Sequence, residues 1–80
     1  MLKWQDYIVS DKNVLVGKPT IIGTRLSVEL ILGRLADGWT ETEILENYPR
    51  LTSEALKAVY AYSYELIKES LLFPLTLQRA

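Results

Sequence analysis

The side chains of this chain that could do chemistry are mainly cations and hydroxyls, which bind phosphate or carboxylate groups. Arg25 follows Gly23 and Thr24, and its planar guanidinium could hold a phosphate or a partner's carboxylate through two N–H groups. Further basic and hydroxyl-bearing residues lie near the expected start of the last helix, a place where proteins commonly contact nucleic-acid phosphates. The predicted nucleic-acid-binding residues are Lys18, Arg25, Arg50, Thr52, Ser53 and Lys57.

A purely structural interpretation of the Gly-Thr-Arg segment stays open beside the functional one. Gly23 suits a hairpin turn that needs a positive φ, and Arg25 could then simply pair with an acidic residue of the second helix. Both interpretations predict a turn, but only the functional one predicts that Arg25 binds a ligand.

Catalysis is not expected. The chain has no cysteine and no histidine, which excludes disulfides, thiolate and imidazole metal sites, a cysteine nucleophile and an imidazole general base. Glu41, Glu43 and Glu46 lie on a solvated helix face at spacings that do not converge on one metal ion. We expect no catalytic residue, no metal site, no cofactor and no enzymatic activity.

The overall charge gives little support for nucleic-acid binding, because nine basic residues face ten acidic ones, for a net charge of −1. The distribution is uneven. Residues 1–26 carry four basic and two acidic residues, whereas residues 27–51 carry two basic and five acidic ones. A phosphate would therefore meet the N-terminal region more favourably than the middle of the chain.

The length of 80 residues predicts one domain, residues 1–80, with three parts. Residues 1–26 read as a β arm, with a strand at 4–9, a second at 20–22 that Pro19 marks as a strand start, and a return of the chain at 25–26. Residues 27–72 read as a helical core and residues 73–80 as a tail. A domain of this size buries a small core, so we expect a homodimer.

Three helix starts are marked by capping residues. Ser27 caps the first helix, which ends at Gly38; Thr40 and Glu43 form a capping box for the second. Pro49 stops the second helix near Asn47 or Tyr48, and Thr52 caps a third helix from Ser53 to about Leu72. A short helix, a tight turn and a longer helix predict a mainly α, helix-turn-helix fold with a short N-terminal hairpin.

Helical spacing predicts the buried residues. The expected stripes comprise Val28, Ile31, Leu32, Leu35 and Ala36 in the first helix, Ile44, Leu45 and Tyr48 in the second, and Ala55, Leu56, Val59, Tyr60, Ser63, Leu66 and Ile67 in the third.

The third helix is longer than a three-helix core needs, and Tyr62 falls opposite Tyr60, so its second half should meet another chain. Tyr60, Tyr62 and Tyr64 could also stack on unpaired bases, but no basic residue lies among them, which favours core and interface roles. The predicted dimer or partner interface comprises Tyr62, Leu66, Leu71, Leu72, Phe73, Leu75 and Leu77.

No apolar run reaches membrane-spanning length, and the N-terminus has no apolar signal core. We therefore expect no membrane association and a cytoplasmic location.

Three separated motifs resemble one known family. They are Gly-Lys-Pro-Thr-Ile-Ile-Gly-Thr-Arg-Leu-Ser-Val at 17–28, Leu-Ala-Asp-Gly-Trp-Thr at 35–40, and Ile-Leu-Glu-Asn-Tyr-Pro-Arg-Leu-Thr at 44–52. In this order they are similar to the prokaryotic domain of unknown function 433 family, over residues 7 to about 64. Ser27 stands where that family often has proline, and the run from Ser53 to Leu56 lacks its usual second acidic residue.

The resemblance implies a homeodomain-like helix-turn-helix fold and an antitoxin role in a type II toxin–antitoxin pair, beside a PIN-like nuclease toxin. The expected function is to bind and neutralise that toxin, with operator DNA as a possible second ligand. Two alternatives stay open: a structural or protein-interaction dimer module, and a plain DNA-binding regulator without a toxin partner.

Overall fold

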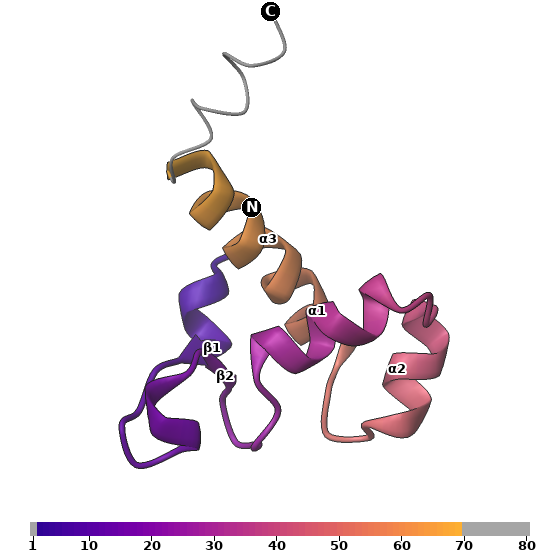
Figure 1. The fold of residues 1–80 in the computed structure, drawn as a ribbon, viewed down its shortest axis with the longest axis horizontal. Helices are drawn as coiled ribbons and strands as arrows, with labels where there is room; N and C mark the ends of the chain where they lie inside the picture. Colours follow the sequence, from indigo (N-terminus) through magenta and orange to yellow (C-terminus); the bar gives the residue numbers. More distant parts are fainter. Residues whose placement is uncertain (1, 70–80) are drawn as a thin grey trace, which may run out of the picture.

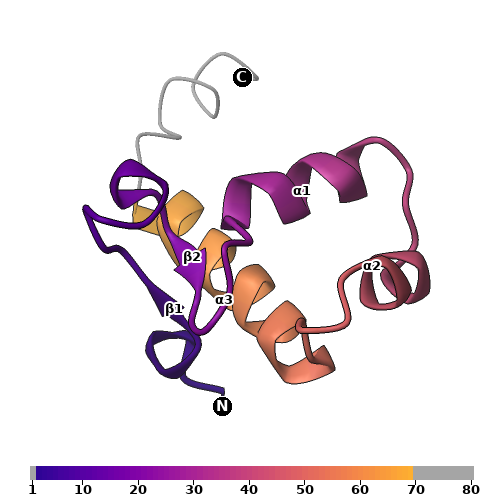
Figure 2. The same cartoon turned by 90° about the horizontal axis from the view of Figure 1, so that it is seen from below.

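The computed structural model describes residues 2–69, and it is mainly α-helical with a small antiparallel hairpin near the N-terminus (Figure 1). In chain order the elements are η1 (Trp4–Asp6), β1 (Ile8–Val9), η2 (Leu15–Gly17), β2 (Thr20–Ile21), α1 (Val28–Ala36), α2 (Glu41–Asn47) and α3 (Ser53–Glu69). The hairpin and α2 lie at opposite sides of the molecule, with α1 and α3 between them (Figures 1 and 2). The predicted fold class, three helices with a short hairpin, is confirmed.

The hairpin is shorter than predicted. Residues 4–6 form a 3-10 turn instead of a strand, because the Asp6 and Tyr7 amides donate to the carbonyls of Lys3 and Trp4. Only Ile8 and Val9 pair with Ile21 and Thr20, so the second strand also stops one residue early. The predicted return of the chain is present, since the Ile21 amide donates to the Leu26 carbonyl at 2.9 Å.

The capping residues act as the sequence predicts. Ser27 Oγ accepts from the Leu30 amide at 2.9 Å, and Thr52 Oγ1 accepts from the Ala55 amide at 3.1 Å. Both halves of the capping box between Thr40 and Glu43 are formed. Local hydrogen bonding at these starts therefore decides where all three helices begin.

The end of α1 also follows the prediction. Gly38 has a φ of +99°, and its amide donates to the Leu35 carbonyl while the Trp39 amide donates to the Arg34 carbonyl. This pair of bonds is a Schellman motif, which requires a left-handed residue and therefore favours glycine. The turn directs Trp39 back toward the last turn of α1.

The core gathers residues from every major element. The buried apolar side chains are Ile8, Ile21, Val28, Ile31, Ile44, Leu51, Ala55, Leu56, Ala58 and Val59. Leu32 and Ala36 were predicted to be buried but are exposed, because α1 is covered only on the side of Val28 and Ile31. Ala58, absent from the predicted stripe, is fully buried because α3 packs against η1 and β1 as well as α1.

The second half of α3 departs most from the prediction. Tyr60, Leu66 and Ile67 were expected on the buried stripe, and all three are exposed. Tyr62, expected on the outward side, is half-buried, with its ring edge-on to Trp4 at 4.8 Å between centroids. The reason is that η1 covers the Tyr62 side, while α3 runs beyond α1 and α2 (Figure 1). The predicted end at Leu72 lies outside the described residues.

The capping box gives a testable stability effect. Replacing Thr40 with alanine removes the acceptor for the Glu43 amide and should lower the free energy of unfolding by about 1 kcal/mol. The control is Thr42→Ala, an exposed position of α2 outside the cap. Urea unfolding of both variants measures the difference, and equal losses would show that the cap contributes nothing specific.

Candidate functional site

Two turns far apart in the sequence form a cleft of about 520 Å³. The first is the turn at residues 23–26, between β2 and α1, and the second runs from Asn47, the last residue of α2, to Arg50 in the loop before α3. We call this the turn cleft; it is lined by Thr24, Arg25, Leu26, Asn47, Tyr48, Pro49 and Arg50. It brings together two of the residues predicted to bind anions, Arg25 and Arg50.

Hydrogen bonds fix the first wall of the turn cleft. The Thr24 hydroxyl donates to the Ile21 carbonyl at 2.8 Å and accepts from the Leu26 amide at 3.0 Å. Gly23 has a φ of +80°, as predicted, and its carbonyl accepts a 3.4 Å bond from Nη1 of Arg50. Arg25 therefore extends from a turn held on both sides.

Aromatic contacts fix the second wall. Tyr48 is stacked against Trp39, with ring centroids 6.3 Å apart and an interplanar angle of 17°, and its hydroxyl accepts from Nε of Arg34 at 3.2 Å. The Arg34 guanidinium also lies over the Trp39 ring at 5.1 Å, a cation–π contact. The hydrogen bond to Tyr48 raises the pKa of Arg34 above its usual value, so this guanidinium stays charged.

The turn cleft is cationic. None of its lining residues is acidic. Within residues 2–69, Arg25 makes no hydrogen bond or ion pair, so the alternative in which it pairs with an acid of α2 is not realised there. Both guanidiniums are exposed and have N–H donors available to an anion.

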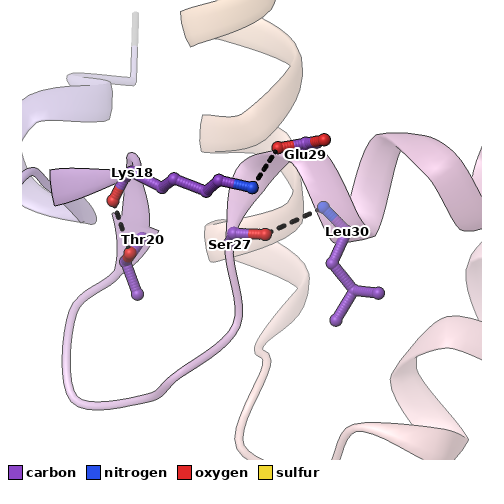
Figure 3. Close-up of polar contacts among 5 residues, drawn as sticks. All are labelled: Lys18, Thr20, Ser27, Glu29 and Leu30. Atoms are coloured by element: carbon purple, nitrogen blue, oxygen red, sulfur yellow. Dashed lines mark hydrogen bonds and ion pairs between the residues drawn. The ribbon is translucent and has the colours of Figure 1, made fainter. Parts of the chain in front are cut away.

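The other residues predicted to bind nucleic acid are not gathered in this cleft. Lys18 forms an ion pair with Glu29 at 2.9 Å, beside the Ser27 cap and the bond from Thr20 to the Lys18 carbonyl (Figure 3). Thr52 uses its hydroxyl to cap α3, whereas Ser53 and Lys57 are exposed on its first turns. Lys18 is therefore separate from the Arg25–Arg50 pair.

A second surface lies on the last turns of α3. Tyr62 packs on Trp4, whose indole N–H donates to Glu65 at 2.6 Å, so η1 is fastened to the helix there. Leu66 follows Val59 by seven residues, about two turns, and so lies on the same side of α3. It is 54% exposed, whereas Val59 is 0% exposed. The apolar stripe of α3 thus continues past the end of the core.

The remaining residues of the predicted interface, Leu71, Leu72, Phe73, Leu75 and Leu77, lie outside the described residues. In the described part of the chain, no three acidic, histidine or cysteine side chains come together in a way that could hold a metal ion. No helix within residues 2–69 has the length and apolar character needed to cross a membrane.

The hydroxyl of Tyr60 donates to Glu41 at 2.8 Å and links α3 to α2. Partial desolvation of the Tyr60 side chain, followed by this hydrogen bond and the charge of the Glu41 carboxylate, raises the pKa of Tyr60 above its usual value. A raised folded-state pKa contributes stability that is complete below pH 10 and is lost as the pH rises through the folded-state value.

The stability difference between the wild type and Tyr60→Phe should therefore be constant below pH 9 and shrink above pH 10. Urea midpoints between roughly pH 7 and 11 measure it. Tyr64→Phe is the control, since the Tyr64 hydroxyl makes no hydrogen bond within residues 2–69. A difference that grows with pH would contradict the assignment.

The chain is thus a small, mainly helical domain with a cationic cleft beside the start of α3 and an exposed apolar residue, Leu66, near its end. Comparison with protein families matches residues 8–63 to the family described as "Protein of unknown function (DUF433)". The chain belongs to this family. No curated protein matches the chain, and no solved structure matches it.

Proposed function

We propose that this chain is an antitoxin of a type II toxin–antitoxin pair, which binds a PIN-like nuclease toxin and blocks it. The observation that carries the proposal is the length of α3, whose last buried residue is Val59 although the helix continues to Glu69. On those extra turns Tyr62 packs against Trp4, but Leu66 is 54% exposed and contributes little to the core. Such a surface is typical of a protein that binds another protein.

The sequence after α3 supports the same role. Residues 71–77 contain four leucines and a phenylalanine, so the apolar character of the helix end continues along the chain. An extended apolar segment can bind a partner by burying alternate side chains in its pockets. The proposal gives the chain a binding role and no chemistry of its own.

The test is to purify the tagged full-length chain from its own host and to identify what is bound. We expect a nuclease that is inactive in the complex and cleaves RNA once the chain is removed. A truncation lacking residues 73–80 should lose the nuclease while keeping its circular dichroism spectrum. A co-purified nuclease that is fully active in the complex, or the absence of any nuclease, would refute the antitoxin role.

DNA binding is a second function that one observation favours. Arg50, Thr52, Ser53 and Lys57 lie at the turn before α3 and on its first turns, where a helix-turn-helix protein contacts bases and phosphates. Against it, Glu41, Glu43 and Glu46 of the neighbouring α2 are exposed and repel phosphate.

A titration with DNA from upstream of the gene, at several salt concentrations, tests this second function. If DNA is bound, Arg50→Gln and Lys57→Gln should each weaken binding and reduce the salt slope by about 1. If the chain binds DNA but no toxin, we would conclude that it is a plain DNA-binding regulator. If it binds neither, we would conclude that it is a structural or protein-interaction module.

We also propose that the free chain is a homodimer in which a second copy covers Leu66 and its neighbours on α3. A twofold axis would place the same exposed stripe of each copy against the other, so each copy would bury the other's apolar surface. The small core of an 80-residue chain supports this arrangement, since a dimer adds the buried area that the monomer lacks.

A further inference from the structure

We propose that the turn cleft is a peptide-recognition site, which binds a protein segment carrying a carboxylate next to an aliphatic side chain. This goes beyond the antitoxin role, because it concerns a different surface. The cleft lies beside the start of α3, and Leu66 is 13 residues further along the helix from Ser53, or about 20 Å. A second ligand could therefore be held at the same time as a partner on the end of α3.

The size and the walls of the turn cleft fit a side chain. Its volume of about 520 Å³ is within the range of ligand pockets, and Leu26, Pro49 and the ring of Tyr48 line it with carbon atoms. A DNA backbone would use these walls less well, because its sugars present only small CH and CH2 groups between charged phosphates, whereas a peptide can bury a whole aliphatic side chain. The apolar lining therefore favours a peptide over a nucleic acid.

The charge of the cleft indicates which group of the ligand should lie next to its aliphatic side chain. Arg25 makes no hydrogen bond or ion pair within residues 2–69, and Arg50 donates one N–H to the Gly23 carbonyl at 3.4 Å. The lining residues include no carboxylate that would compete. Because guanidinium groups bind carboxylates through two parallel hydrogen bonds, an acidic side chain or a chain end is the complementary group.

The cleft is also held in shape before any ligand arrives. The Thr24 hydroxyl fixes the first turn, and the bond from Arg34 together with the Trp39 ring fixes Tyr48. A preformed site loses less conformational entropy on binding than a flexible one. The bond from Arg50 to Gly23 further joins the two turns.

The experiment is an NMR titration of the ¹⁵N-labelled full-length chain with the capped peptide acetyl-Ala-Leu-Glu-Leu-Ala-amide. We expect saturable shifts of the amides of Arg25, Leu26 and Arg50, and at least tenfold weaker binding of the matched peptide with glutamine in place of glutamate. Equal binding of the two peptides, or no saturable shift up to roughly 10 mM peptide, would overturn the proposal.

Variants locate the contact. Arg25→Gln should weaken binding of the glutamate peptide at least tenfold, and Arg25→Lys should weaken it less, because lysine keeps the charge but lacks the planar fork. Lys12→Gln, which removes the same charge from an exposed position outside the cleft, should change nothing. Arg50→Gln provides a second, independent test at the opposite wall, and unchanged binding in both cleft variants would overturn the assignment.

A parallel titration with a random-sequence DNA duplex separates the two anion sources. Shifts of the same amides by DNA and none by the peptide would overturn the proposal and assign the cleft to phosphate. The peptide titration uses neither the toxin nor the truncation of residues 73–80, so its failure would leave the antitoxin proposal intact, and failure of the antitoxin test would leave the cleft proposal intact.

Discussion

Replacing Ile31 with alanine is expected to lower the free energy of unfolding by about 2–5 kcal/mol, because it leaves a cavity in a small core. Ile31 is 0% exposed and lies in the cluster that joins α1 to the hairpin, α2 and α3. A chain of 80 residues has a total stability of about 4–12 kcal/mol, at roughly 0.05–0.15 kcal/mol per residue. The variant should therefore lose a large share of its stability and unfold at a clearly lower urea concentration than the wild type.

The matched control is its neighbour, Leu32→Ala. Leu32 is 36% exposed on the same helix, and its truncation should cost less than about 1 kcal/mol. Urea unfolding followed by circular dichroism measures both variants. Similar losses at the two positions would contradict the burial of one side of α1 and would support the broader stripe that the spacing predicts.

Replacing Leu66 with glutamate is expected to convert the proposed homodimer into a monomer. A charge in the centre of an apolar interface must be desolvated without a partner, so the dimer dissociation constant should rise at least about 100-fold. Each folded monomer should keep its helical content, because Leu66 is already 54% exposed in the single chain. Sedimentation equilibrium at micromolar concentrations measures the change.

The control for this second variant is Ile22→Glu, at a position of matched exposure, 51%, just after β2. It introduces the same charge outside α3 and should leave the dimer unchanged. A wild-type chain that sediments as a monomer throughout this range would refute the dimer. If both variants dissociate the dimer equally, the effect is not specific to α3: the dimer interface then lies elsewhere, or any added charge weakens the dimer.

Several features of the fold follow from local chemistry that can be read along the chain. Thr40 and Glu43 are three residues apart, which is all that a capping box requires, and Gly38 supplies the positive φ at the end of α1. These groups act on backbone atoms within one helical turn, so their effect does not depend on the rest of the protein. The mainly α fold and the starts of all three helices were predictable for this reason.

The candidate site was only partly predictable. Arg25 and Arg50 are both noticeable as cations beside turns, but 24 residues separate them, and nothing in the sequence places them in one cleft. The cluster of Arg34, Trp39 and Tyr48 that shapes the cleft was missed. Its one available signal was the glycine before Trp39, since a Schellman turn brings the next residue back onto the helix end.

Local sequence sets the starts of all three helices and the ends of α1 and α2, because caps, glycine and proline act within a few residues. Which faces of the helices are covered depends instead on packing between elements distant in the chain. Helical spacing places Val59 and Leu66 on one stripe, yet Val59 is buried and Leu66 is exposed, because α3 runs beyond α1 and α2 (Figure 1). Likewise η1 covers Tyr62 and leaves Tyr60 to meet Glu41. Periodicity defines a face of a helix, but burial depends on what packs against it, and that is set by contacts between residues distant in the chain.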